Sequence, residues 1–182
     1  TEVLTSPFVA TSIHDAFGLA ADDPRRGATR LANPLSDAEP ELRTSLLPGL
    51  LAAMQRNIGR GLRDLALFEL GLVFLERPDV PVPPAPGVDG RPSDAQLEAM
   101  NAALPHQPRR AAVVLCGDAE PAGWQGPARA ATWAEAVEFG RVIGRVARAG
   151  LSVRQARRAP WHPGRCAEFV LGERVIGHAG EL

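Results

Sequence analysis

The chain has 182 residues and a formal net charge of −1, so it can bury the core of one domain and carries no excess charge favouring non-specific nucleic-acid binding. Apolar residues make up 45% of the chain, yet no apolar run approaches the ~20 residues of a membrane span. All twenty basic residues are arginine, which leaves no lysine to act as a Schiff-base, phosphate-binding or general-base group.

The first part of the chain predicts short elements followed by a long helix. "TEVLTSPFV" is rich in residues that favour strands and should end near Pro7, and "SIHDAFGLA" (12–20) predicts a short helix. "ATRLANPLSD" predicts a short strand and then a loop. The next helix should run from about Thr44 to Asn57, with Thr44 or Ser45 as its N-cap.

That helix has a broad apolar face. Pro48 is compatible with it because proline is tolerated in the first helical turn. The positions that share the apolar stripe are Leu46, Leu50, Ala53 and Met54, widened by Leu47 and Leu51. The pattern suits burial against a sheet or against another chain.

A strand and a proline-rich loop follow. "LALFELGLVFLE" (65–76) has apolar residues on both faces, which predicts a strand covered on both sides. Residues 77–92 carry so many prolines and glycines that we expect a long exposed loop. Ser93 stands three residues before Gln96, which is the spacing of a capping box, so a helix over about 93–104 is predicted.

The C-terminal part predicts alternating strands and one long helix. "AAVVLCG" (111–117) should be a short buried strand, and "EPAGWQGPARAA" a loop. Thr132 and Glu135 form a second capping box that opens a helix to about Arg148, and Gly150 should stop it.

The last segments predict a strand over 151–157 and a hairpin that turns at Gly172-Glu173. Together the elements predict an α+β fold with a mostly antiparallel sheet flanked by helices. We expect one domain over residues 1–182, interrupted by the proline-rich loop at 77–92.

The cysteines and histidines give only a weak metal-site pattern. Two cysteines are too few for a disulfide framework, and nothing in the sequence suggests secretion, so we expect a reducing cytoplasm. The candidate zinc ligands are Cys116, His162, Cys166 and His178. They lack a C-x2-C pair, and a turn histidine with a core cysteine explains the same residues. We therefore predict no metal ligands.

Arginines around "NIGRG" could hold phosphate, because the glycines would let backbone N–H groups approach the anion. These residues are Arg56, Arg60 and Arg63. The favoured alternative is a solvated turn at the C-terminal end of the helix dipole. No dinucleotide-binding, Walker or nucleophile-elbow motif is present, and no catalytic triad is evident.

The stretch "NPLSDAEPELRTSLLPGLLAAMQRN", followed by "LALFELGLVF", resembles the beta chain of bacterial phenylalanyl-tRNA synthetase in its catalytic-like module. The resemblance continues through "WHPGRCA" and "VIGHAGEL" and covers nearly all of the chain; its weakest section is 77–107. It implies a class II synthetase-like fold and a fragment of a longer chain. It also implies a non-catalytic module that packs beside an alpha chain in an (αβ)2 enzyme, which joins phenylalanine to tRNA with ATP and Mg2+.

Against that family, this sequence lacks charges that catalysis needs. Catalytic alpha chains have a run resembling G-R-V-Y-R where this chain has Gly71 to Leu75, so Leu72 and Leu75 stand at the two arginine positions. Leucine cannot donate a hydrogen bond to a phosphate. We therefore assign no catalytic and no cofactor-binding residue in this fragment, and expect ATP and Mg2+ to bind elsewhere in the complete enzyme.

The sequence thus predicts an assembly module of a phenylalanine–tRNA ligase beta subunit, inactive on its own. Candidate interface residues are Leu46, Leu50 and Met54 on one helix and Trp133 and Val137 on the other. Candidates for polar contacts are Arg43, Arg56 and Arg60, although Arg43 could instead pair with Glu39, Glu41 or Glu69 to fix its loop. The alternatives are an active adenylate-forming or nucleotide-binding domain, and RNA contact through Arg56, Arg60 and Arg63. We expect the fragment alone to bind tRNA little.

Overall fold

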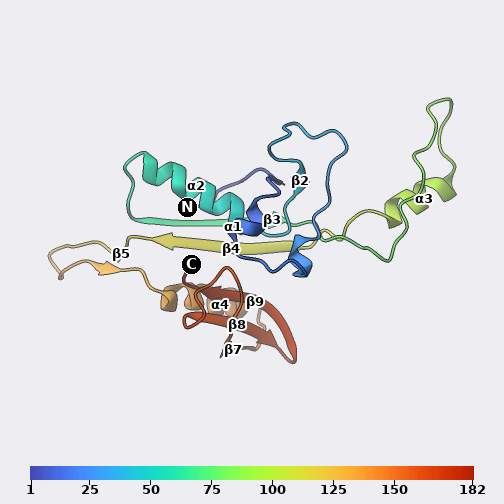
Figure 1. The fold of residues 1–182 in the computed structure, drawn as a ribbon. Helices are drawn as coiled ribbons and strands as arrows, with labels where there is room; N and C mark the ends of the chain where they lie inside the picture. The colour runs from blue at the N-terminus through green and yellow to red at the C-terminus, as the bar shows by residue number, and fades with distance from the viewer.

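A computed structural model describes residues 1–182, and its largest core lies between one helix and a pair of strands. Helix α2 (Leu47–Gly59) packs on one face of β3 (Leu65–Leu72) and β4 (Arg109–Cys116) (Figure 1). The two strands are antiparallel, with Leu65 opposite Cys116 and Leu72 opposite Arg109. The buried cluster between these elements contains Leu46, Leu50, Ala53, Met54, Leu67, Val73 and Val114.

Helix α2 begins three residues later than the sequence predicts. Its N-cap is Leu46, which offers no side-chain hydrogen bond; the Ser45 hydroxyl oxygen instead accepts from the N–H of Leu47 at 3.2 Å. Thr44 donates its hydroxyl to the carbonyl of Arg25 and does not cap the helix. Pro48 lies in the first turn as predicted, because its missing N–H would have no helical partner there.

Strand β3 is covered on one face only, so the prediction of cover on both faces was wrong for this chain. Leu67 and Glu69 are buried under α2, whereas Phe68 is 38% and Leu70 is 54% exposed. The sequence of the strand is apolar on both faces. The outer face is nevertheless largely exposed, because little of it is packed against another element.

The N-terminal elements are shorter than predicted. They are β1 (Phe8–Val9), α1 (Ile13–Ala16), the 3-10 helix Pro24–Arg26 and β2 (Glu41–Leu42), which pairs with β1. The strand expected near residue 30 is reduced to one bridge between Arg30 and Glu41. Residues 1–3 run beside β3, and the N–H of Val3 donates to the carbonyl of Phe68 at 2.9 Å.

The proline-rich stretch belongs to an arm that leaves the body of the molecule. Residues 81–92 contain no helix or strand, and helix α3 (Asp94–Ala102) projects at the far end of the arm (Figure 1). The capping box is confirmed: Ser93 accepts from the N–H of Gln96, and the Gln96 side chain accepts from the N–H of Ser93.

The C-terminal elements form a second packed unit. Strands β7 (Leu151–Gln155), β8 (Cys166–Leu171) and β9 (Arg174–Gly180) make an antiparallel sheet in that order. The hairpin between β8 and β9 turns at Gly172, whose φ of +61° suits glycine, as predicted. Helix α4 (Trp133–Val146) packs on this sheet through the cluster Val137, Ala167, Phe169 and Ala179.

The start of α4 is confirmed and its end is not. Thr132 and Glu135 form the predicted capping box, and hydrogen bonds from Thr132 and Arg129 lower the pKa of Glu135 to about 2. The helix ends at Val146, and Arg148 takes the left-handed conformation at φ 52°. Arginine therefore occupies the terminating position that the sequence assigned to Gly150.

Two further strands, β5 (Asp118–Glu120) and β6 (Arg129–Ala130), pair where a loop was predicted. The fold is α+β, as expected, with four helices. The strands form four small antiparallel sheets of two, two, two and three strands, where one sheet was expected. None of the helices has both the length and the apolar character needed to cross a membrane.

Candidate functional site

Arg43 lies in a buried polar cluster beneath β3. Its side chain is 5% exposed, and Nη1 donates to Glu69 Oε1 and to Thr5 Oγ1, each at 2.8 Å. Nε donates to the carbonyl of Leu72 at 3.0 Å. Thr5 in turn donates its hydroxyl to Glu69 Oε2 at 2.6 Å, so the fully buried carboxylate is neutralised and hydrogen-bonded.

This cluster joins three segments and leaves no free cation. Of the three carboxylates considered for Arg43, Glu69 is the one that pairs with it. Gly71 makes room for the guanidinium, because a Cβ there would lie 2.5 Å from Arg43 Nη2. The arginine is thus committed to holding the N-terminal segment and the loop before α2 against β3.

Leu72 and Leu75, which stand at the two arginine positions of the catalytic chains, lie in different surroundings. Leu72 lies on the open face of β3 and is 40% exposed, while Leu75 packs against the α2 core. The open face, from Phe68 through Leu70 to Leu72, is apolar throughout. It offers no hydrogen-bond donor from these side chains to a phosphate group.

Most of the predicted interface residues are buried in the hydrophobic cores of this chain. Leu46, Leu50 and Met54 are 2%, 0% and 8% exposed and belong to the α2 core. Val137 is 5% exposed and packs on the C-terminal sheet. Of the five, only Trp133, at 48% exposed, has substantial surface to offer a partner.

Helix α4 instead presents a second apolar stripe on its outer side. The stripe has the spacing i, i+3, i+4, i+7 of one helical face. Its members are Phe139 (40% exposed), Val142 (38%), Ile143 (45%) and Val146 (81%). It lies opposite the inner face, where a Cβ on Gly140 would come within 2.0 Å of the Phe169 ring. The sequence signal was available: the helix carries apolar residues on two opposite sides.

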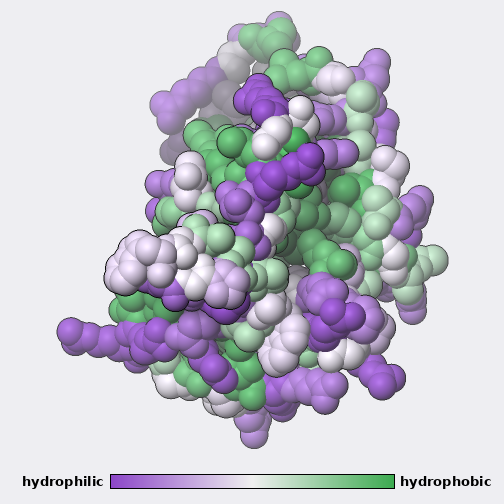
Figure 2. Space-filling model, turned by 90° about the vertical axis from the view of Figure 1, so that its left-hand side faces the viewer, coloured by the Kyte–Doolittle hydropathy of each residue, from purple (hydrophilic) through white to green (hydrophobic).

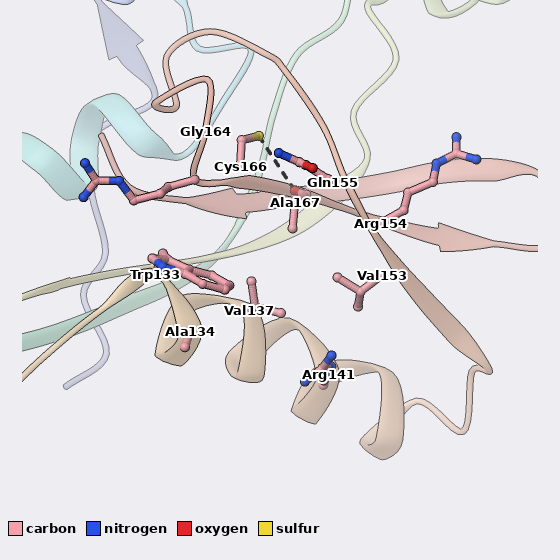
Figure 3. Close-up of a pocket in the computed structure, with 11 residues that line it drawn as sticks. Trp133, Ala134, Val137, Arg141, Val153, Arg154, Gln155, Gly164, Cys166 and Ala167 are labelled. Carbon is pink, nitrogen blue, oxygen red and sulfur yellow. Dashed lines mark hydrogen bonds between the residues drawn. The ribbon is translucent and has the colours of Figure 1, made fainter.

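A cavity of about 460 Å³ lies between α4 and the C-terminal sheet. Figure 3 shows Trp133 and Val137 approaching it from the helix, and Val153 and Ala167 from the strands. Two of its arginines are already paired, Arg154 with Glu168 and Arg165 with Glu181. The cavity is mainly apolar and brings together no catalytic set of groups.

The candidate metal ligands are dispersed. No group of three or more His, Cys, Asp or Glu side chains is placed to hold a metal ion. His162 lies in a turn, where Nδ1 accepts from the N–H of Gly164, and Cys166 is buried, which raises the pKa of its thiol. His178 stacks on Trp161 with ring centroids 5.5 Å apart, and burial lowers its pKa.

The basic turn, defined here as residues 56–63, lies on the surface. Arg56, Arg60 and Arg63 are exposed, and none of them takes part in an ion pair.

Comparison with known proteins identifies the relatives of this chain. Residues 1–182 match the family model described as the phenylalanyl tRNA synthetase beta chain CLM domain. The phenylalanine–tRNA ligase beta subunit of Streptomyces avermitilis is 54% identical over 180 residues, covering 97% of this chain and 22% of that protein. The corresponding subunit of Thermobifida fusca is 50% identical over 186 residues, covering 100% and 22%. The chain therefore spans about a fifth of the length of these curated relatives.

Proposed function

Because this chain belongs to the family of phenylalanyl-tRNA synthetase beta chain CLM domains, we propose that it serves as a non-catalytic assembly module of a phenylalanine–tRNA ligase beta subunit. In this proposal it supports an alpha chain that charges tRNA with phenylalanine. The observation that carries the proposal is the outer stripe of α4, which is apolar along its length and 38–81% exposed, although Phe139 also lines a pocket with Leu65 and Cys116.

The outer stripe has the properties of an assembly surface. A helix with one solvent-facing side normally keeps that side polar, because exposed apolar area costs free energy. Here Phe139, Val142 and Ile143 stay 38–45% exposed although the inner side of the helix already fills a core. Obligate interfaces between subunits bury apolar surface of this kind.

The proposal that the module is non-catalytic rests on the absence of cationic side chains at the two positions where catalytic chains carry arginine. Adenylate formation requires cations to stabilise the phosphates of ATP in the transition state. Leu72 and Leu75 supply none, and the buried cation, Arg43, is committed to Glu69. An adenylate-forming reaction in this chain would have to recruit other charges, and no observation favours it.

The finer parts of the proposal follow from the family. The antiparallel strands and flanking helices would belong to a class II synthetase-like sheet, and residues 1–182 to a single catalytic-like domain. ATP and Mg2+ would bind to the alpha chain in an (αβ)2 assembly. We place the interface with the alpha chain on the outer side of α4 and not on the buried residues of α2.

Replacing Ile143 with glutamate should weaken assembly of the complete beta chain with its alpha chain. The change places a carboxylate in the centre of the apolar stripe, where a subunit interface would have to desolvate it. We expect a loss of about 2 kcal/mol or more, which raises the Kd at least ~30-fold. Sedimentation velocity on mixtures of the two chains measures the change.

The matched control is Val88→Glu, the same kind of change at a side chain that is 99% exposed on the arm. It should leave the sedimentation pattern unaltered. Ile143→Glu should also keep its circular dichroism spectrum, because the side chain is already 45% exposed. Normal assembly of a folded Ile143→Glu variant would refute the α4 surface.

A further inference from the structure

The basic turn carries three guanidinium groups that have no hydrogen-bonding or ion-pair partner in the chain. Arg56, Arg60 and Arg63 make no side-chain hydrogen bond or ion pair, in contrast to Arg129 and Arg165, which pair with glutamates. A cation beside the C-terminal dipole of α2 accounts for one such residue. It does not account for Arg63, which lies beyond the helix end at Gly59.

The hairpin formed by residues 118–130 starts next to this turn and carries a tryptophan at its tip. Trp124 is 94% exposed at the tip. Gly123 and Gly126 exchange two backbone hydrogen bonds of 3.0 and 3.1 Å, which closes the tip around Trp124 and Gln125. The Arg129–Glu120 pair, 2.9 Å apart, ties the base of the hairpin. The indole is therefore held on a closed turn and not on a loose loop.

The base of the hairpin and the C-terminal end of the basic turn lie side by side, joined through the residues next to them. The N–H of Asp118 donates to Asp64 Oδ1 at 2.8 Å, and the thiol of Cys116 lies 3.3 Å from the carbonyl of Arg63. Both features occupy the left-hand end of the molecule in Figure 1, beyond the C-terminal end of α2. Figure 2 faces this end and shows strongly hydrophilic surface interleaved with apolar surface.

The chemistry of this end differs from that of the rest of the chain. Residues 55–64 and 117–131 contain four arginines against three carboxylates, in a protein whose formal net charge is −1, and of the four arginines only Arg129 is in an ion pair. Guanidinium groups that have no carboxylate partner can bind a phosphate through two parallel hydrogen bonds. An exposed indole stacks on a base that has left a helical stack. A protein pocket for the tryptophan would not require the free arginines.

We propose that the basic turn and the Trp124 hairpin form a binding site for a single-stranded RNA segment, with Arg56, Arg60 and Arg63 on its phosphates and Trp124 stacked on one of its bases. The solvated-turn interpretation, favoured from the sequence alone, does not explain why the hairpin that starts beside the turn carries an almost fully exposed tryptophan. The hairpin reaches up to about 20 Å from its base, so the site spans several nucleotides. The base of the hairpin adjoins Phe139 of the α4 stripe, across a pocket that Asp64 and Asp118 also line.

Crosslinking in the complete enzyme tests where the hairpin tip lies. Trp124 is replaced by p-benzoylphenylalanine in the complete beta chain, which is assembled with the alpha chain and irradiated with an unmodified tRNA transcript. We expect a covalent adduct with the RNA at unpaired nucleotides. An adduct only with a protein chain would make the hairpin a protein anchor and overturn the proposal, as would the absence of any RNA adduct.

Binding measurements on the same assembly test the arginines independently. The triple variant R56Q/R60Q/R63Q should bind the tRNA transcript more weakly and lower the slope of log affinity against log salt by about 2, at ~0.7 per phosphate contact. Trp124→Ala should weaken binding about 5- to 150-fold with the slope nearly unchanged. Arg91→Gln, an exposed change on the arm, is the control and should alter neither quantity.

Sedimentation of these variants separates the two proposals. Intact assembly with the predicted losses of RNA affinity supports the RNA site. Intact assembly with unchanged RNA affinity and slope refutes the RNA site and leaves the assembly module standing. If the Trp124 variant instead loses assembly, the hairpin belongs to a subunit interface and the RNA proposal fails.

Discussion

Replacing Leu50 with arginine should unfold this module. Leu50 is fully buried at the centre of the α2 core, where it lies among Leu46, Met54 and Leu67. Removing a buried leucine costs about 2–5 kcal/mol by itself, and a buried unpaired guanidinium adds several more. The total is comparable with the whole stability of a domain, about 5–15 kcal/mol. Guanidinium unfolding followed by circular dichroism of the 182-residue chain measures the loss.

Ala52→Arg is the matched control for this prediction. It puts the same side chain on the same helix at an exposed position, so the unfolding midpoint should change little. A Leu50→Arg variant that folds normally and loses only alpha-chain association would show that α2 faces outward. It would contradict the core described here.

Arg43→Met should destabilise the module by about 3–5 kcal/mol. The change keeps most of the side-chain volume but leaves the Glu69 carboxylate, which is fully buried, without its cation. The carbonyl of Leu72 and the hydroxyl of Thr5 lose hydrogen-bonding partners at the same time. Urea unfolding of the single variant measures the cost.

A double-mutant cycle with Glu69→Leu distinguishes an ion pair from a packing role. Removing both charges should recover most of the stability lost in Arg43→Met, because no buried charge then remains uncompensated. If the losses of the two single variants simply add in the double variant, Arg43 and Glu69 do not stabilise each other. Arg43 would then be available for the polar contact that the sequence suggested.

The sequence predicted those elements whose signals are local. Both capping boxes, at Ser93 and Thr132, and the turn at Gly172 appear where their spacing placed them, because a cap or a turn depends on only a few neighbouring residues. The end of α4 was misplaced because glycine is the usual terminating residue, whereas here Arg148, two residues before Gly150, takes the left-handed conformation.

Properties that depend on distant residues were not predictable in the same way. Periodicity identified the apolar face of α2 but could not say whether this chain or another covers it, and the structure shows that β3 and β4 do. The Arg43–Glu69 pair joins residues 26 apart, so the sequence could offer Glu69 only as one of three partners. On α4 the sequence indicated Trp133 and Val137 as interface residues, but Val137 is buried and the more continuous apolar surface is the outer stripe.

Hydrogen–deuterium exchange of the complete beta chain, alone and after addition of its alpha chain, tests the assembly surface most directly. If the outer stripe is the assembly surface, amide exchange in α4, around Phe139–Val146, should slow on addition of the alpha chain. Exchange in α2 should not change, because its apolar face is already buried. Unchanged exchange in α4, with protection confined to α2 or to regions outside this module, would contradict the proposed assembly role of the outer stripe.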